Sequence, residues 1–453
     1  MRQTNMRHLS ILTATFLLCS ITAFSQQPRP LPELTSKRLL NDLQITVAPT
    51  PYLGSNMAIG LLVRYGAYFD PAGKGGVASF LSRMFLKAAI DKTAKDIQDE
   101  LAYLEASIDV RCDWDGFRFV LRGPSAKFER CLLLLYQVVG EAEFSDADFA
   151  AVKQSVLEEM QKSSDPRQRI HAQFENVLFS GTSHGRPLEG TPKSIAAITA
   201  GDIRFFYRKF ISPNQASLIV VGDVSAPEVL QRASRIWGVW VRNDAVPFTF
   251  VQPRKPAGRQ IYLEDDPASP AAQFIMGNLF PPRDDPAYAN ALLAASIFQE
   301  RLTKALPTSL LTVGTAGRRM ASPFYVQGQA AADQVIEQLL KIESVAEEMK
   351  LSLVTKEELD AARNKVIEEF NRELGSAEGL CGIMLEAELY QLGSNYASMY
   401  PDLLRRCDAD AIRQAAKNLL FPNGEVLLMR GPAVVLKPVL NPLGTLRSQI
   451  PEN

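Results

Sequence analysis

The sequence is poor in histidine. Only His8, His171 and His184 occur among its 453 residues, although imidazole is the commonest protein ligand of metals. No two of them have the H-x-x-x-H spacing that places two side chains on one face of a helix. A two-histidine zinc site beyond the N-terminal segment would have to use both His171 and His184. We expect instead that His184 lies in a turn and His171 on an ordinary helix face.

The chain also lacks an excess of either charge. Its 49 lysines and arginines balance 50 aspartates and glutamates, which gives a formal net charge of -1. Nucleic-acid binding depends on a basic surface that neutralises phosphates, so we expect no nucleic-acid partner. Long polar or low-complexity runs are missing as well, and this length predicts about two or three globular domains.

Cysteine is scarce, and no pair has the C-x-x-C spacing of a structural zinc site. One of the five cysteines, Cys19, lies in the N-terminal segment, and the others are Cys112, Cys131, Cys381 and Cys407. The sequence does not fix their pairing. Four scattered cysteines in so long a chain are typical of small buried apolar residues.

The N-terminus has the three parts of a secretory signal peptide. Arg2 and Arg7 precede an apolar stretch over 9–24, and Ala23-Phe24-Ser25 forms a cleavage site. We therefore predict a leader over 1–25, a periplasmic or secreted protein, and no transmembrane domain after the leader is removed. The alternative is a retained anchor, against which the serines and threonines in this short stretch argue. Leu18 before Cys19 also disfavours a lipoprotein site.

Strand and helix patterns follow one another along the chain. Strands are predicted over 57–68, 109–122 and 216–221, and helices over 126–141, 145–162 and 200–210. The cluster Gly73-Lys74-Gly75-Gly76 opens a further apolar helix. It lacks the G-x-x-x-x-G-K-[ST] spacing of a phosphate-binding loop, so we expect no nucleotide site. These elements predict an α+β fold in which helices pack on one face of a mixed sheet.

The second half of the chain repeats landmarks of the first. Pro213-Asn214, an apolar run and Gly222 recur with the same spacing as Pro422-Asn423, an apolar run and Gly431. Upstream, Val156-Leu157-Glu158-Glu159 recurs as Val366-Ile367-Glu368-Glu369. We therefore predict two homologous domains. The expected organisation is a leader over 1–25, a first domain over 26–245, a proline-rich linker over 246–258, a second domain over 259–440 and a tail over 441–453.

The apolar helix after the glycine cluster carries a recognisable frame. Gly75-Gly76-Val77-Ala78-Ser79-Phe80-Leu81-Ser82-Arg83-Met84-Phe85-Leu86-Lys87 resembles the segment G-x-A-H-F-L-E-H-M-x-F-K of the pitrilysin/insulinase (M16) family of zinc metallopeptidases. In that family, two histidines of H-x-x-E-H bind zinc and the glutamate handles the proton of the metal-bound water. By this resemblance Ser79 and Arg83 stand at the histidine positions and Ser82 at the glutamate position. The three are vestigial positions, and no catalytic residue is expected there.

A further zinc-binding glutamate of the family lies in a helix that looks like E-R-x-V-I-L-x-E-[IM]. The matching stretch is Val152 to Met160, which places Glu159 at the ligand position and Val152 at a supporting acidic position. Since one ligand position of three keeps a ligand residue, we expect no metal and no cofactor, whereas active relatives hold zinc.

The resemblance extends over most of the chain beyond the leader. It continues through Asp165-Pro166, Gly185-Arg186-Pro187 and Gly190-Thr191-Pro192. In the second half, active relatives carry an arginine and a tyrosine that grip the substrate. Here Arg301 matches a structural arginine of that motif, Pro307 stands where the gripping arginine belongs, and no tyrosine follows.

Other kinds of catalytic site find little support. A serine nucleophile needs a base within reach, and the helix neighbour of Ser79 and Ser82 is Arg83. Glu158 and Glu159 are adjacent and point to different helix faces, so they do not form a paired carboxylate site.

The resemblance implies a LuxS/mitochondrial-processing-peptidase-like fold of two domains in a clamshell. It further implies a catalytically inactive subunit that pairs with an active, H-x-x-E-H-bearing M16 partner and shapes its chamber or binds extended peptides. Two alternatives stay open: an active zinc metalloendopeptidase with a displaced site, and a free-standing peptide-binding scaffold. The sequence does not identify the substrate or the partner.

Overall fold

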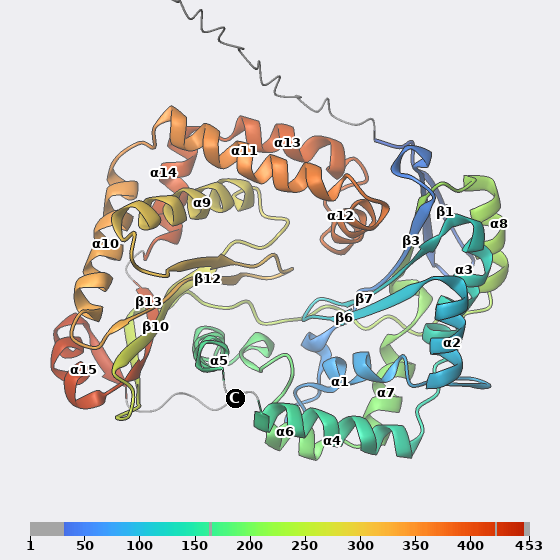
Figure 1. Cartoon of the computed structure of the whole chain (residues 1–453), viewed down its shortest axis with the longest axis horizontal. Helices are drawn as coiled ribbons and strands as arrows, with labels where there is room; N and C mark the ends of the chain where they lie inside the picture. Colours follow the sequence, from blue (N-terminus) through green and yellow to red (C-terminus); the bar gives the residue numbers. More distant parts are fainter. Residues whose placement is uncertain (1–30, 163–164, 422–423, 448–453) are drawn as a thin grey trace, which may run out of the picture. The chain divides into compact units, whose positions relative to one another are not determined.

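A computed structural model describes residues 31–162, 165–421 and 424–447 (Figure 1). The predicted leader over 1–25 and the repeated Pro422-Asn423 landmark lie outside the described residues. No helix within the described residues is both long and apolar enough to cross a membrane.

The first half of the chain builds a six-stranded mixed sheet in the order β1-β2-β8-β3-β7-β6. β8 is central and wholly buried, as its run of apolar residues predicts. It pairs in parallel with β2 and antiparallel with β3. The strands are β1 (Thr35–Arg38), β2 (Gln44–Pro49), β3 (Asn56–Val63), β6 (Ser107–Cys112), β7 (Phe117–Pro124) and β8 (Ala216–Gly222). A separate small hairpin joins β4 (Ala88–Ala89) to β5 (Lys92–Thr93).

The second half builds a second six-stranded sheet in the order β11-β12-β10-β13-β9-β14. β13 takes the place of β8, since it pairs in parallel with β9 and antiparallel with β10. The two sheets differ at one edge. β1 is antiparallel to its neighbour β2, whereas β14 is parallel to its neighbour β9. The strands are β9 (Gly258–Asp265), β10 (Ala271–Phe280), β11 (Thr312–Thr315), β12 (Ser322–Ala331), β13 (Gly424–Gly431) and β14 (Thr445–Arg447). The sequence repeat therefore corresponds to a repeat of topology.

Each sheet packs against helices of its own half, which confirms the predicted α+β class. In the first half these are α1 (Val77–Met84), α2 (Ala94–Leu104), α3 (Phe128–Gly140), α4 (Asp146–Lys162), α6 (Pro192–Ala197), α7 (Ala200–Phe210) and α8 (Ala226–Trp237). In the second half they are α9 (Tyr288–Ala305), α10 (Val335–Leu351), α11 (Lys356–Glu373), α13 (Tyr396–Arg406), α14 (Ala409–Leu419) and α15 (Ala433–Leu440).

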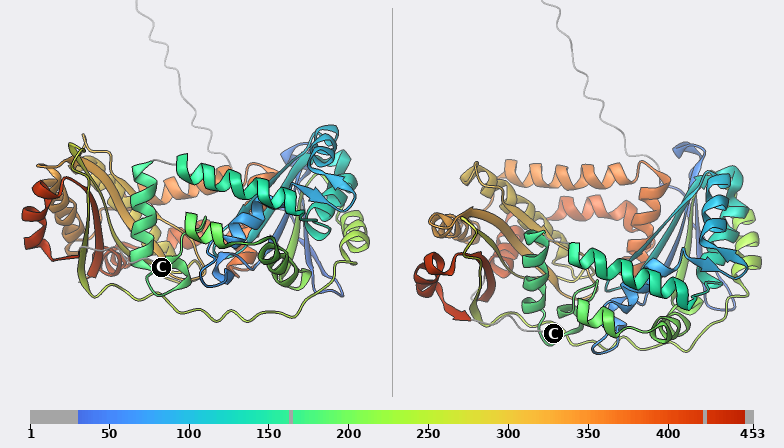
Figure 2. Two further views of the ribbon diagram at one scale, coloured as in Figure 1. Left: turned by 90° about the horizontal axis from the view of Figure 1, so that it is seen from below. Right: turned by 60° about the horizontal axis from the view of Figure 1, so that its bottom comes forward.

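Two helices cross to the sheet of the other half. α5 (Pro166–Leu178) contacts β10 and β13, and α12 (Ala377–Leu389) contacts β3 and β8. Figure 1 shows α12 beside β3, and Figure 2 shows the green α5 beside the olive and red strands of the second sheet. Glycines in the two sheets allow these helices to approach the strands closely. A Cβ at Gly60 would lie 2.6 Å from the Cys381 sulfur of α12, and one at Gly277 would lie 2.9 Å from the Phe174 ring of α5.

Two expectations need correction. The stretch 109–122 is not one strand, because a turn at Asp113–Gly116 divides it into β6 and β7, which pair as a hairpin. The expected tail over 441–453 contains β14, which pairs with β9 and so belongs to the second sheet.

The segment 246–258 lies between α8 and the start of β9, and Phe248 within it stacks on Tyr65 with ring centroids 5.3 Å apart. The other domain boundaries stay a prediction.

The four cysteines beyond residue 31 are all free thiols. Cys131, Cys381 and Cys407 are buried and Cys112 is half-buried, in keeping with small apolar side chains.

Candidate functional site

The helix that carries Ser79, Ser82 and Arg83 has a buried carboxylate at its start. Asp70 accepts hydrogen bonds from the backbone N–H groups of Gly76, at 2.7 Å, and Ala78, at 2.9 Å. Burial raises the pKa of Asp70 to about 7, and the hydrogen bonds from Ala78 and Gly76 act in the opposite direction. Gly76 itself has a left-handed backbone, with φ of 96°, which favours glycine. Asp70 therefore fixes where α1 begins.

Ser79 and Arg83 lie one helical turn apart and both reach Glu189. The Ser79 hydroxyl donates to Glu189 Oε2 at 2.7 Å, and Arg83 Nη2 approaches the same oxygen at 3.4 Å. Ser82 Oγ donates to the backbone carbonyl of Ser79 at 2.6 Å. The hydroxyl of Ser82 is thus bonded within its own helix.

Glu159, on the neighbouring helix α4, completes this group. Arg83 Nη1 donates to Glu159 Oε2 at 2.6 Å, and Ser155 Oγ donates to Glu159 Oε1 at 3.0 Å. The hydrogen bond from Arg83, followed by that from Ser155, lowers the pKa of Glu159. One guanidinium therefore lies between two carboxylates, those of Glu159 and Glu189.

The structure thus brings together three of the four predicted positions, Ser79, Arg83 and Glu159, and leaves Ser82 bonded to its own helix. Glu189 was missed by the sequence analysis. It lies between the segments Gly185-Arg186-Pro187 and Gly190-Thr191-Pro192, in a turn whose position in space no spacing rule predicts. Asp70 was missed for a similar reason, since it caps a helix from six residues upstream.

The chemistry open to this group is limited. The Ser79 hydroxyl donates to the Glu189 carboxylate, which Arg83 also contacts, so its proton is held in a charge-assisted hydrogen bond. Arginine donates five N–H groups and has no lone pair for a metal.

The two histidines of the described residues have structural partners. His171 lies in α5 with its ring 4.7 Å from that of Tyr325. His184 lies in a short 3-10 helix at Ser183–Gly185, is buried, and shares a hydrogen bond between Nε2 and the Tyr68 hydroxyl. Burial, aided by the charge of Arg318, lowers the pKa of His184 to about 3. Across the described ranges, no group of three or more histidine, cysteine, aspartate or glutamate side chains could hold a metal ion.

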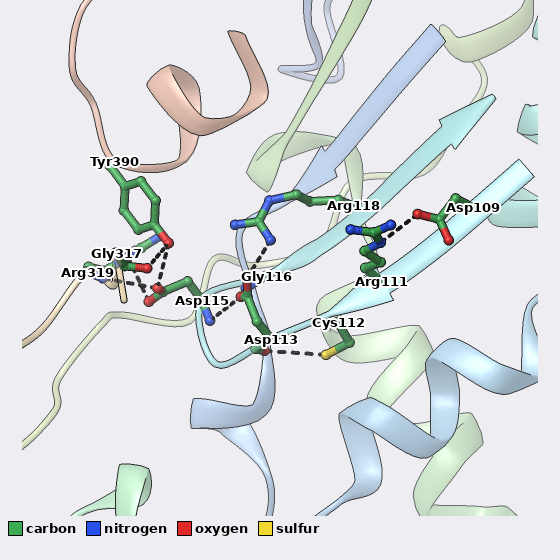
Figure 3. A network of polar contacts seen from close by, with 10 residues as sticks. All are labelled: Asp109, Arg111, Cys112, Asp113, Asp115, Gly116, Arg118, Gly317, Arg319 and Tyr390. Carbon is green, nitrogen blue, oxygen red and sulfur yellow. Dashed lines mark hydrogen bonds and ion pairs between the residues drawn. The ribbon is translucent and has the colours of Figure 1, made fainter. Parts of the chain in front are cut away.

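A second polar cluster joins equivalent hairpin turns of the two halves (Figure 3). Asp115, in the β6-β7 turn, is 2% exposed and its Oδ2 accepts from the backbone N–H of Arg319 at 3.0 Å. The Tyr390 hydroxyl lies 3.2 Å from the same oxygen and 2.9 Å from the Gly317 carbonyl. Burial, followed by the nearby charge of Asp113, raises the pKa of Asp115 to about 6. This cluster joins the β6-β7 turn of the first half to residues of the second half.

Comparisons with known proteins agree with this architecture. A family model described as Insulinase (Peptidase family M16) matches residues 53–192, and one described as Peptidase M16 inactive domain matches residues 197–366. Together they cover more than half of the chain.

Individual relatives are distant. A protein of Rickettsia bellii named uncharacterized zinc protease is 24% identical over 230 residues, which are 51% of this chain and 55% of that protein. The mitochondrial-processing peptidase subunit beta of Bos taurus is 20% identical over 55% of this chain and 51% of its own. The matched part thus spans about half the length of these relatives. A crystal structure of a protease from Helicobacter pylori superposes with a TM-score of 0.82 at 17% identity, covering 89% of this chain and all of that one, which establishes the fold.

Proposed function

Because this chain belongs to peptidase family M16, we propose that it is a catalytically inactive member. In this proposal it pairs with an active zinc-bearing M16 subunit and shapes or binds that partner's peptide substrate. It would act in the periplasm or outside the cell, as its leader-like N-terminus suggests. The observation that carries the proposal is the position of Arg83, whose guanidinium lies between Glu159 and Glu189.

The residues at this position do not fit zinc. A catalytic zinc needs about three protein ligands, which are histidine, cysteine, aspartate or glutamate side chains, and of the three matched positions only Glu159 is such a residue. The positive charge of Arg83, 2.6 Å from Glu159 Oε2, would also repel a cation. These side chains therefore do not support a metal-dependent reaction at this position.

A role in peptide binding draws support from the open edge of the first sheet. β6 is the outermost strand there and contacts α1. An extended peptide can add to such an edge through main-chain hydrogen bonds. A role in pairing draws support from the relative named as a subunit of a processing peptidase.

Restoring the ligands tests the loss of the metal site. The double substitution Ser79→His and Arg83→His should give about one zinc per chain by metal analysis, because Glu159 and the helix backbone are already in place. The wild-type chain should hold no stoichiometric zinc, and Glu159→Gln in the double variant should remove the gained metal. Stoichiometric zinc in the wild type, with peptide cleavage that a chelator abolishes, would instead indicate a peptidase with a displaced site.

Pairing is tested separately. Purification of the native protein from its source should recover a companion that contains H-x-x-E-H. Repeated recovery of this chain alone, with measurable peptide affinity, would favour a free-standing peptide-binding scaffold and contradict the pairing.

A further inference from the structure

A polar pocket of about 440 Å³ shares no lining residue with the cluster around Arg83. It lies where the ends of β1 and β3 and the start of β8 meet the C-terminal end of α12. Its polar lining comes from Arg38, Arg64, Gln215, Glu388, Gln391 and Ser394. First-half strands and a second-half helix therefore contribute to one cavity.

Arg64 is held firmly at this pocket. Its backbone N–H donates to the Gln215 carbonyl at 2.9 Å, and its Nη2 donates to Ser217 Oγ and to Glu388 Oε2, each at 2.9 Å. A guanidinium has five N–H groups in a planar fork. The two side-chain contacts both use Nη2, which leaves Nε and Nη1 available to a ligand.

Positive charge is in excess around Arg64. Burial lowers the pKa of Arg64, Glu388 raises it, and the nearby charges of Arg319 and Arg38 lower it further. The charge of Arg319 is paired with that of Asp115, since Arg319 Nε lies 3.9 Å from Asp115 Oδ1. Arg38 is exposed at the end of β1 and forms no ion pair with any residue that the structure describes.

The balance of charge decides what the pocket can hold. Arg38 and Arg64 bring two positive charges, against which Glu388 brings one negative charge and the carbonyl end of α12 roughly half of one. The small positive remainder suits a monoanion and disfavours a dianion such as phosphate. The guanidinium fork matches a carboxylate, and the amides of Gln215 and Gln391 can hydrogen-bond to peptide groups.

We propose that this pocket binds the C-terminal carboxylate of a peptide, with Arg38 and Arg64 as its receptors. The inference rests on the proposed role in peptide binding and adds an end-specific site to it. A cavity of this size, within the range of small-molecule sites, takes the last one or two residues of the peptide.

The first test compares two ends of one peptide on the full chain. A neutral hexapeptide with an N-terminal fluorescein is titrated with protein as the free acid and as the C-terminal amide, and binding is followed by fluorescence anisotropy. The free acid should bind saturably and the amide about tenfold or more weakly, the loss expected for a charge-assisted contact. Equal binding of the two peptides, no saturable binding of the acid, or its displacement by equimolar inorganic phosphate would overturn the proposal.

Three substitutions that each change one charge are expected to affect binding of the free acid differently. Arg38→Gln should weaken binding of the free acid about five- to tenfold and leave the amide unchanged. Glu388→Gln removes the competing carboxylate and should strengthen binding of the acid about threefold or more. Lys37→Gln is the matched control, since Lys37 is the neighbour of Arg38 in β1 and donates to Ser234 Oγ at 3.1 Å, and it should change neither.

The direction of each change in affinity tests whether the arginines receive a carboxylate. A loss with Glu388→Gln, or an equal loss with Lys37→Gln, would show that the arginines do not receive a carboxylate. Either failure would leave the result of the zinc-restoration experiment untouched, because Ser79, Arg83 and Glu159 do not line this pocket.

Discussion

At the scale of single residues, the guanidinium of Arg83 lies between the carboxylates of Glu159 and Glu189. The side chains of Arg83, Glu159 and Glu189 are 37%, 55% and 54% exposed, so these ion pairs contribute at most about 1 kcal/mol to stability.

The carboxyl group of Asp70 is expected to affect stability more than the ion pairs of Arg83 do. Its pKa is about 7 in the folded chain and about 4 in an unfolded one, so between these values the folded state holds a proton that the unfolded state has lost. The free energy of unfolding should therefore fall as pH rises from about 4 to 7, by up to about 1.4 kcal/mol per pH unit. In Asp70→Asn this part of the pH dependence should be absent. Urea unfolding followed by circular dichroism between pH 5 and 8 measures both slopes.

The control for this prediction is Asp99→Asn, which changes a side chain that is 64% exposed. That variant should keep the wild-type slope. If Asp70→Asn also keeps it, the carboxyl of Asp70 does not titrate in this range.

The sequence predicted part of the group around Arg83. The spacing of Ser79 and Arg83 placed both on one helix face, and the family resemblance placed Glu159 opposite them. Glu189 could not be predicted, because it lies in a turn and only the packed fold brings it to α1.

At the scale of elements, local signals predicted most helices and strands but not their partners. α7 begins and ends where its sequence pattern predicted, at Ala200 and Phe210, because a capping box opens it. In contrast, the Asp115-Gly116 pair, a common turn signal, went unread within 109–122, and one strand was predicted where a hairpin forms. α12 is apolar over most of its surface, which predicts burial but cannot say which sheet it covers.

The contact of α12 with β3 can be tested at one glycine. In Gly60→Ala the new methyl group would lie 2.6 Å from the Cys381 sulfur and 2.8 Å from Leu385 Cδ1, so α12 must shift away from the sheet. Overpacking of this kind costs typically about 1–3 kcal/mol. Urea unfolding should show a loss of that size.

Gly382, in the same helix, provides the matched substitution. A Cβ there has nothing within 4 Å, and alanine is the better helix former by roughly 1 kcal/mol. Gly382→Ala should therefore be neutral or stabilising. Equal losses at both glycines would mean that the cost arises within the strand or helix and not from their contact.

At the scale of the whole chain, the exchange of α5 and α12 ties the halves together. The repeat of sequence predicted two similar sheets, and the structure has them. It could not predict the exchange, since a helix that follows its own half in sequence is by default expected to pack there. Ile170 and Phe174 of α5, both fully buried, share a core with Ile275 and Leu428 of the second sheet.

Neither half should therefore fold alone. Fragments 32–245 and 258–447, produced separately, would each expose an apolar sheet face together with a crossing helix, and we expect aggregation and no near-ultraviolet circular dichroism signal. Produced together in one cell, they should assemble, so that a tag on one fragment recovers both in equal amounts. Phe174→Asp in the first fragment should abolish this recovery, because it buries a charge in the shared core without a partner. A cooperative unfolding transition in either isolated fragment would contradict the interdependence of the halves and return α5 and α12 to the role of surface helices.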